Sequence, residues 1–546
     1  MKKFLLPTFT MLFLLTGFLI GNSVSNKISA QHVPTQTAKA AKQLGSPFSL
    51  LPETKVSQLL LLMNEAYVDP IDVDSIVDDA MQEVIKRLDP HSAYIPKEDL
   101  EIVNSELSAS FSGIGIQFSI QNDTIQVVSV ISGGPSEGMG ILAGDKIVSV
   151  NDSAFTGKIV TNERVMHKLR GPKGTKVNLG IVRRGTPDVL SFTIIRGDIP
   201  VHSVDAQFII ETKTGKKIGF VRVNRFGEST YDEFITAMAS LRSQGASAYI
   251  VDLRENSGGY MDQSIMMANE FLQRGDLIVY SEGRAYPRYE AVANGLGRFQ
   301  REKLVVLIDN FSASASEIFA GAMQDNDRAT IIGRRSFGKG LVQQQIPFSD
   351  GSAVRLTVAR YYTPSGRCIQ KPYKMGEQED YEMELLERLQ HGEYFSEDSV
   401  QIADTTKYYT KTGRVVRGGG GIMPDIFVGT DTTLYTAYFN RIVNNAYTYQ
   451  FAYQYTDQHR TELSKYSDWQ SLEKHLLKAN WLPELIEFVK KKGIEPNPAQ
   501  LEVSKPLLVR LVNAYIVRNI LNDEGFFPLF ERDDQITKRA VEELSK

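Results

Sequence analysis

Two short stretches of this chain carry residue types that could do chemistry. The first, "SASASE", runs from Ser312 to Glu317, and the second, "SFGKG", runs from Ser336 to Gly340. Small residues and glycines let another group approach the backbone closely. The pattern therefore indicates a place where a serine hydroxyl, or the one lysine of these stretches, Lys339, contacts a substrate, a phosphate or another strand.

A nucleophile is the first interpretation. Ser314 follows a predicted strand and precedes a predicted helix, where free N–H groups and the helix dipole favour negative charge. A serine hydroxyl needs a base, and Lys339 can serve if burial keeps its amine neutral. Gln343, four residues further on, shares the lysine's face in a strand or a helix and could orient the amine.

The same interpretation requires N–H donors for a developing oxyanion. The N–H of Ala315 is one candidate, and Gly258 or Gly259 of the loop "DLRENSGGY" supplies the other. The alternative interpretation of the "SASASE" stretch is structural, because alternating serines and alanines also permit close helix packing. Spacing alone does not choose among the three serines of "SASASE".

A phosphate-binding loop is a competing interpretation of the lysine. Residues 333–339, "GRRSFGK", have the spacing of such a loop. However, Gly340 stands where Ser or Thr should bind magnesium, and the strand-like "LVQQQIPF" replaces the helix that should face the phosphates. The sequence therefore argues against an ATPase.

Composition limits the remaining classes. The 546 residues should form several domains at about 100–200 residues each. A net charge of −4 without a basic run argues against nucleic-acid binding. Cys368 is the single cysteine, so no intrachain disulfide can form. The seven histidines are scattered without a metal-binding motif, so we expect no metal and no cofactor.

The N-terminus has the pattern of an export signal. Lys2 and Lys3 precede an apolar run over residues 4–20, followed by small and polar residues. We expect residues 1–30 to be a cleaved signal peptide or, if uncut, an anchor in the inner membrane. Either way the body of the protein is expected to be exported to the periplasm.

Residues 110–198 change to short strands with one helical segment and resemble a PDZ domain. In that family a glycine loop directs N–H groups at a peptide's terminal carboxylate, and the adjoining strand edge pairs with the peptide. Here Ile114 and Ile116 would line an apolar pocket beside the loop. The residues expected to bind substrate are Ser112, Gly113, Ile114, Gly115 and Ile116.

The other segments have distinct patterns. Residues 50–109 are helical by apolar spacing, and their turn "DPHSAYIP" is interpreted as a packed turn. Residues 199–430 alternate strands and helices, which predicts an α/β core. An acidic insertion at residues 373–409 is interpreted as a solvated charged helix, with a lid or docking surface as alternatives. Residues 431–546 form a helical extension, a possible route to a homo-oligomer or an adaptor.

The segment "NFSASASEIFAGAMQDNDRATIIGRRSFGKGLVQ", with "DLRENSGG" and "GSAVRLTVARYYTPSGRCIQ", resembles the carboxyl-terminal processing peptidases of serine peptidase family S41. The resemblance covers roughly residues 55–430. It implies an α+β multi-domain protein with a crotonase-like α/β peptidase core and an inserted PDZ domain. It also implies that Ser314, rather than its neighbouring serines, is the nucleophile, Lys339 the general base and Gln343 the residue that steadies the lysine.

We therefore expect an exported serine endopeptidase that recognises protein or peptide substrates by their free C-terminal tails. One alternative is a catalytically idle PDZ scaffold that only binds peptides, but a vestigial site should have lost at least one of these residues. A carrier of apolar ligands on the same core would not need Lys339 between two glycines.

Overall fold

The computed structural model describes residues 54–546 apart from residues 106, 122, 132, 143, 184–185 and 402–403. The expected signal or anchor, residues 1–30, lies outside these residues. In the described part of the chain, no helix combines the length and the apolar character needed to span a membrane. The described chain forms two compact units, residues 108–208 with 431–538 and residues 54–107 with 209–430 and 539–546.

The second and larger unit contains, apart from residues 204–208 of β10, a six-stranded sheet in the order β10-β11-β12-β15-β16-β21. The strands from β11 to β21 are parallel. Strands β11 and β12 are almost wholly buried, as their continuous apolar sequences predict for a sheet covered on both faces. The strands are β10 (Val204–Glu211), β11 (Lys217–Val223), β12 (Ala248–Asp252), β15 (Lys303–Ile308), β16 (Thr330–Gly333) and β21 (Ile426–Phe427).

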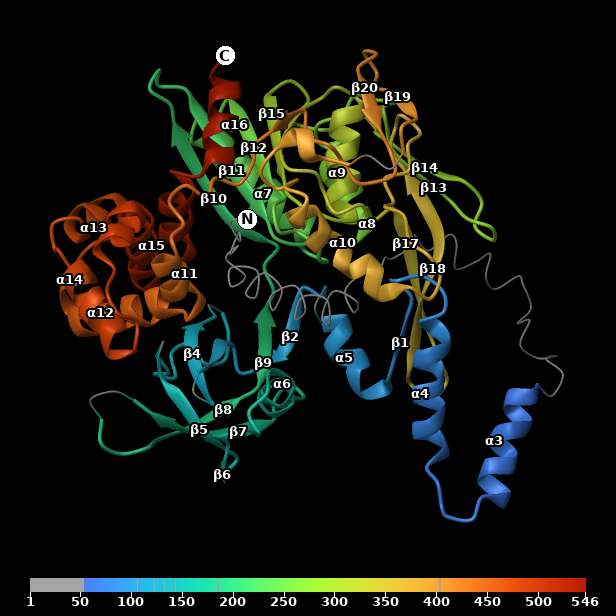
Figure 1. The fold of residues 1–546 in the computed structure, drawn as a ribbon, viewed down its shortest axis with the longest axis horizontal. Helices are drawn as coiled ribbons and strands as arrows, with labels where there is room; N and C mark the ends of the chain where they lie inside the picture. Colours follow the sequence, from blue (N-terminus) through green and yellow to red (C-terminus); the bar gives the residue numbers. More distant parts are fainter. Residues whose placement is uncertain are drawn as a thin grey trace, which may run out of the picture. The chain divides into compact units, whose positions relative to one another are not determined.

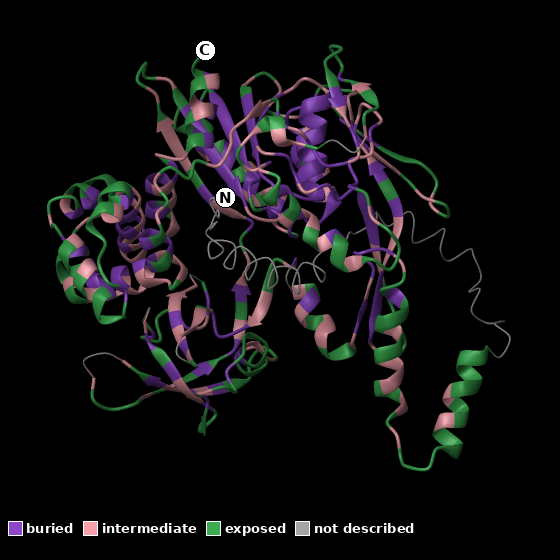
Figure 2. Cartoon of the chain, viewed as in Figure 1, coloured by how far each residue is buried: buried purple, intermediate pink, exposed green. Residues whose placement is uncertain are grey.

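Three helices connect these strands (Figure 1): α7 (Thr230–Ser243), α8 (Met261–Asn269) and α9 (Ala315–Asp325). Every residue of α9 is buried, and the helix is purple throughout in Figure 2. The loops after β12 and β15 leave the carboxyl ends of neighbouring parallel strands, so both loops lie at one edge of the sheet.

An antiparallel sheet in the same unit carries the segment after Lys339. It consists of β1 (Ala93–Ile95), β13 (Leu277–Glu282), β14 (Tyr289–Val292), β17 (Leu341–Pro347) and β18 (Ala353–Tyr362). In its register Gln343 of β17 lies opposite Thr357 of β18. The N-terminal helices are α3 (Lys55–Ala66), α4 (Val73–Ile85) and α5 (Lys97–Ser105).

The insertion forms α10 (Gln378–Gln390), the short helix η2 (Glu397–Ser399), and the hairpin of β19 (Lys407–Tyr409) and β20 (Val415–Arg417). The interpretation of α10 as a solvated charged helix describes one face of the helix, where Glu379, Asp380 and Glu387 are exposed, but not the other. Tyr381, Leu385 and Arg388 are each at most 5% exposed. A buried arginine requires hydrogen-bond acceptors, and the structure supplies them from the site described below.

The smaller unit contains a second antiparallel sheet in the order β3-β4-β5-β7-β8, with β6 beside β5. Its elements are β3 (Ile116–Gln121), β4 (Thr124–Val130), β5 (Lys146–Val150), β6 (Ser153–Ala154), α6 (Asn162–Leu169), β7 (Lys176–Val182) and β8 (Leu190–Ile195). Where the chain enters and leaves this segment, β2 (Ser110–Gly113) pairs with β9 (Gly197–Pro200).

The same unit includes the helical extension, with an apolar core of its own that contains Phe451, Trp481 and Val512. The helices of the extension are α11 (Ala437–Asn444), α12 (Tyr447–Leu463), α13 (Trp469–Leu476), α14 (Leu482–Lys491), α15 (Pro498–Glu531) and α16 (Gln535–Ser545), of which residues 539–545 of α16 belong to the larger unit. The expected class, an α+β multi-domain protein with a helical C-terminal region, is thus confirmed.

Candidate active site

Ser314 lies at the turn between β15 and α9. Its φ and ψ angles are 54° and −113°, an unusual conformation for a residue with a side chain. Such strain is found where surrounding structure holds a residue for a functional reason. Ser314 is 1% exposed, and it directly precedes the first N–H groups of a fully buried helix.

Hydrogen bonding distinguishes the three serines of the "SASASE" stretch. The Ser312 hydroxyl donates to the Leu253 carbonyl at 2.8 Å, and the Ser316 hydroxyl donates to the Asn256 carbonyl at 2.9 Å. The Ser314 hydroxyl is buried and has no hydrogen-bond partner among the described residues. Of these three hydroxyls, that of Ser314 is therefore the one whose oxygen is not committed to the backbone.

Lys339 is the basic group of the site. It is 5% exposed, and burial, followed by the charge of Arg355, lowers the pKa of its amine to about 7. Its Nζ donates to Gln343 Oε1 at 3.1 Å. The Gln343 amide in turn donates to the His91 carbonyl. Gln343 is thereby fixed with its oxygen toward the lysine.

Glu317 links the serine and the lysine through their backbones. Its Oε2 accepts from the N–H groups of Ser314 at 2.9 Å and Lys339 at 2.8 Å. Its Oε1 accepts from the Gly338 N–H at 2.8 Å and from the Ser336 hydroxyl at 2.5 Å. Burial raises the pKa of Glu317 to about 7 against the opposing effect of these four donors. The residues 314–317 read S-x-x-E, a capping-box pattern that could have indicated this role from sequence.

Two further groups that sequence reasoning missed complete the surroundings. The Tyr361 hydroxyl lies within hydrogen-bond distance of the carbonyls of Ser314 and Lys339. The turn at residues 89–96 is packed, as interpreted, but it also supports the site through the His91 carbonyl. Asp89 holds that turn by accepting from the backbone N–H of His91 at 2.9 Å.

Of the proposed oxyanion donors, Ala315 and Gly258 adjoin Ser314. Ala315 is the first residue of α9, so its N–H has no acceptor within the helix. Gly258 approaches so closely that a Cβ there would lie 2.7 Å from Ser314 Cβ, and a Cβ on Gly259 would lie 2.2 Å from the Phe226 carbonyl oxygen. The Gly258 N–H already donates to Asn256 Oδ1 at 2.8 Å. Within the described ranges, no cluster of His, Cys, Asp or Glu side chains could hold a metal ion.

The residues expected to bind a peptide tail belong to the smaller unit. Ser112 and Gly113 are in β2, paired with Asp198 and Gly197 of β9. Ile114 is 3% exposed inside the core of this domain, so its side chain does not line an open pocket as expected. The outer strand of the sheet, β3, begins at Ile116 and leaves an edge to which an extended peptide can add.

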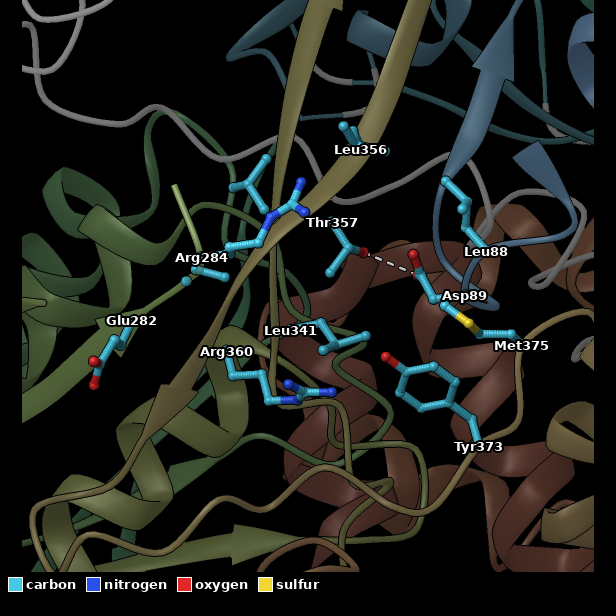
Figure 3. A pocket seen from close by; sticks show the side chains of 13 residues that line it. Leu88, Asp89, Glu282, Arg284, Leu341, Leu356, Thr357, Arg360, Tyr373 and Met375 are labelled. Atoms are coloured by element: carbon cyan, nitrogen blue, oxygen red, sulfur yellow. Dashed lines mark hydrogen bonds between the residues drawn. The ribbon is translucent and has the colours of Figure 1, made fainter. Parts of the chain in front are cut away.

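A pocket of about 270 Å³ adjoins strands β17 and β18 in the larger unit (Figure 3). Its wall includes Leu341, two residues after Lys339, and Thr357, whose hydroxyl donates to Asp89 at 2.9 Å. Apolar side chains mix with the charged Arg284 and Arg360. The pocket is thus formed by the strands that carry the site, although Lys339 itself does not line it.

Comparison with known proteins places the chain in a family. Peptidase family S41 matches residues 217–383, the PDZ domain matches residues 112–194, and a family of unknown function matches residues 438–522. The chain is 38% identical over 309 residues to the carboxy-terminal-processing protease of Bartonella bacilliformis, covering 56% of this chain and 69% of that protein.

A second relative, the carboxyl-terminal-processing protease of Synechocystis sp., is 36% identical over 59% of this chain and 75% of its own length. Among solved structures, a photosystem II D1 C-terminal processing protease is similar, with 22% identity, a TM-score of 0.37, and coverage of 78% of this chain and 96% of that one. The protein is therefore a serine-type peptidase. It belongs to peptidase family S41, among the carboxy-terminal processing proteases, as the sequence resemblance implied.

Proposed function

We propose that this protein is an exported endopeptidase that cleaves peptide bonds with a Ser314–Lys339 dyad. The observation that supports this best is the presence of two unusual groups in one buried site. The buried Ser314 hydroxyl is uncommitted among the described residues, and the Lys339 amine has a pKa lowered to about 7. A lysine with this pKa is largely neutral just above neutrality and can accept a proton.

The proposed reaction has two halves. The Ser314 oxygen attacks the carbonyl carbon of the scissile bond while Lys339 accepts the hydroxyl proton, and the resulting ammonium then protonates the leaving amine. Water, deprotonated by the neutral lysine, hydrolyses the acyl-enzyme and regenerates the hydroxyl. In both halves the N–H of Ala315 would stabilise the oxyanion, together with that of Gly259 or, once released from Asn256 Oδ1, that of Gly258.

Gln343 and Glu317 would act without touching the substrate. Gln343 accepts one N–H of the lysine, which orients the amine. Glu317 holds the backbones of both dyad residues. Because these contacts exist before substrate arrives, no reorganisation energy is needed at the moment of reaction.

Substrate choice is proposed to reside in the PDZ domain. A free C-terminal carboxylate would bind the backbone N–H groups of the loop at Gly113–Gly115, and the tail would extend along β3. The expected export signal, with Lys2 and Lys3 before an apolar run, supports a substrate pool outside the cytoplasm.

A peptide-binding scaffold without activity is the alternative. It is disfavoured because the nucleophile, the base and their supporting contacts are all present. The test is to incubate the purified protein and its Ser314→Ala variant with an unfolded protein and to map the products by mass spectrometry. Internal cleavage by the wild type alone is expected, whereas an intact substrate in both reactions would favour the scaffold.

A further inference from the structure

The glycine-flanked loop that carries Lys339 is held from outside by helix α10 of the insertion. Arg388 of α10 donates from Nη1 to the Ser336 carbonyl at 2.8 Å and from Nη2 to the Phe337 carbonyl at 3.0 Å. Both carbonyls belong to the three residues before Lys339. A guanidinium with two donors in a rigid plane fixes a pair of carbonyls better than a flexible ammonium does.

Arg388 is itself fixed. Glu384, one turn earlier on α10, accepts from Arg388 Nε at 2.6 Å and from Lys371 Nζ at 2.9 Å. The backbone N–H of Lys371 donates to the Gly338 carbonyl at 2.9 Å. The carbonyls of residues 336, 337 and 338 are therefore all bound on this side.

The opposite side of the loop is bound by the core. Glu317 accepts the N–H groups of Gly338 and Lys339, and the Phe337 N–H donates to the Ser312 carbonyl at 3.0 Å. The loop thus lies between two sets of partners, one from α9 and its preceding turn and one from the insertion and Lys371. Since Gly338 has no side chain that could pack, its conformation depends on these backbone contacts.

A second contact of α10 reaches the other end of the loop. The Tyr381 hydroxyl lies 2.9 Å from His91 Nε2 and 3.2 Å from Gln370 Nε2. Gln370 Oε1 accepts the Gly340 N–H at 2.8 Å, and the His91 carbonyl accepts the amide of Gln343. Tyr381 therefore supports both the residue that follows Lys339 and the partner of Gln343.

We infer that Arg388 and Tyr381 are positioning residues for Lys339, so that helix α10 is a working part of the catalytic apparatus rather than a lid or a docking surface. The inference rests on the proposed Ser314–Lys339 dyad. It predicts an effect on the chemical step and on the titration of the lysine, because a loosened loop both misplaces the amine and admits water to it.

The test uses the full-length protein with Arg388→Lys and Tyr381→Phe, two changes that preserve charge or ring. The matched controls are Glu387→Gln, at an exposed position beside Arg388, and Tyr409→Phe, whose side chain is 58% exposed. Cleavage of fluorescein-labelled casein gives kcat and KM from pH 5 to 9, and thermal unfolding reports the fold.

We expect each variant to lower kcat by about 10-fold or more with little change in KM, since small displacements of a catalytic group are costly. The rising limb of the pH profile should also move to higher pH, because a hydrated lysine returns toward its ordinary pKa. The controls should match the wild type. Replacement by Arg388→Ala should be worse than Arg388→Lys, which retains one donor group.

Two results would overturn the inference. The first is an unchanged kcat and pH profile in both folded variants. The second is a lower kcat with an unchanged pH limb and a lower melting temperature, which would mean a structural role only. Ser314→Ala and Lys339→Ala are assayed alongside. If these retain activity, the proposed dyad fails, whereas their inactivity beside fully active Arg388 and Tyr381 variants rejects only the positioning role.

Discussion

The backbone N–H groups of Ser314 and Lys339 donate to one and the same oxygen, Oε2 of Glu317. A shared acceptor fixes the main chains of the two residues relative to each other. The backbones of the proposed nucleophile and base are thus linked through a buried carboxylate that need not contact substrate. This arrangement, and the low pKa of Lys339, lead to the predictions below.

Ser314→Ala and Lys339→Ala should each reduce cleavage by at least about 10⁴-fold, and the double variant should be little worse, because residues that act as a unit are not additive. Casein cleavage, with circular dichroism to confirm folding, measures this. Ser153→Ala and Lys374→Ala, at exposed positions, are the matched controls. A single variant with most of the wild-type rate would reject the dyad.

Activity of the wild type should fall on acidification through neutrality. The pKa of Lys339 is lowered to about 7 by burial, and only the neutral amine can accept the serine proton. The rate should therefore be low below this pKa, rise through it and level off above it. A profile of kcat/KM against pH checks the sign, and full activity at pH 5 would contradict a lysine base.

Glu317→Gln should lower kcat and change the steepness of the acid limb. The carboxylate accepts four donors, whereas an amide directs its own N–H groups at two of them. The pKa values of Glu317 and Lys339 are both about 7, and only the deprotonated Glu317 carboxyl can accept all four donors. The wild-type log rate should approach two units per pH unit at low pH, and the variant should show one. Equal slopes in the wild type and the variant would show that protonation of Glu317 does not contribute to the acid limb.

Gln343→Glu should move the rising limb to higher pH. A carboxylate beside Lys339 favours the ammonium form, so the lysine pKa increases and more base is needed to neutralise it. Gln343→Ala should instead lower kcat without introducing charge. Comparing the two pH profiles separates the effect of a charge on the Lys339 pKa from the effect of amine orientation on kcat. An unshifted limb in Gln343→Glu would argue against the contact between Gln343 and the amine.

Tail recognition is tested by amidating a substrate's C-terminus. Loss of the terminal charge removes charge-assisted hydrogen bonds, so the amidated form should be cleaved more slowly at low concentration. Gly113→Val should abolish this difference, since a Cβ at position 113 would lie 3.1 Å from Ile199 Cδ1 and the larger valine side chain would have to displace its neighbours beside the loop. Equal rates for both substrates with the wild type would show that the carboxylate is not read there.

The sequence predicted the alternating core, the PDZ segment and the catalytic candidates because these depend on local patterns and on a resemblance to a known family. The supporting contacts were not predictable in this way. The amide of Gln343 is bound by a carbonyl 252 residues earlier in the chain. Helix α10 has the composition of a solvated helix, and the acceptors that let Arg388 be buried lie 52 and 51 residues away. Ile114 was misplaced because the resemblance identified a binding loop without showing that this side chain of the loop turns into the domain core.

The burial of Lys339 has a consequence for the life of the chain before it is folded. In an unfolded chain this lysine is hydrated, has an ordinary pKa of about 10.4 and is protonated at neutral pH. In the proposed mechanism the base is therefore created by folding itself, when burial lowers the pKa of the Lys339 amine. A newly made chain, which is itself an unfolded polypeptide, carries no active peptidase that could digest it or its neighbours. In this mechanism, proteolytic activity appears only when the core that buries Lys339 is complete.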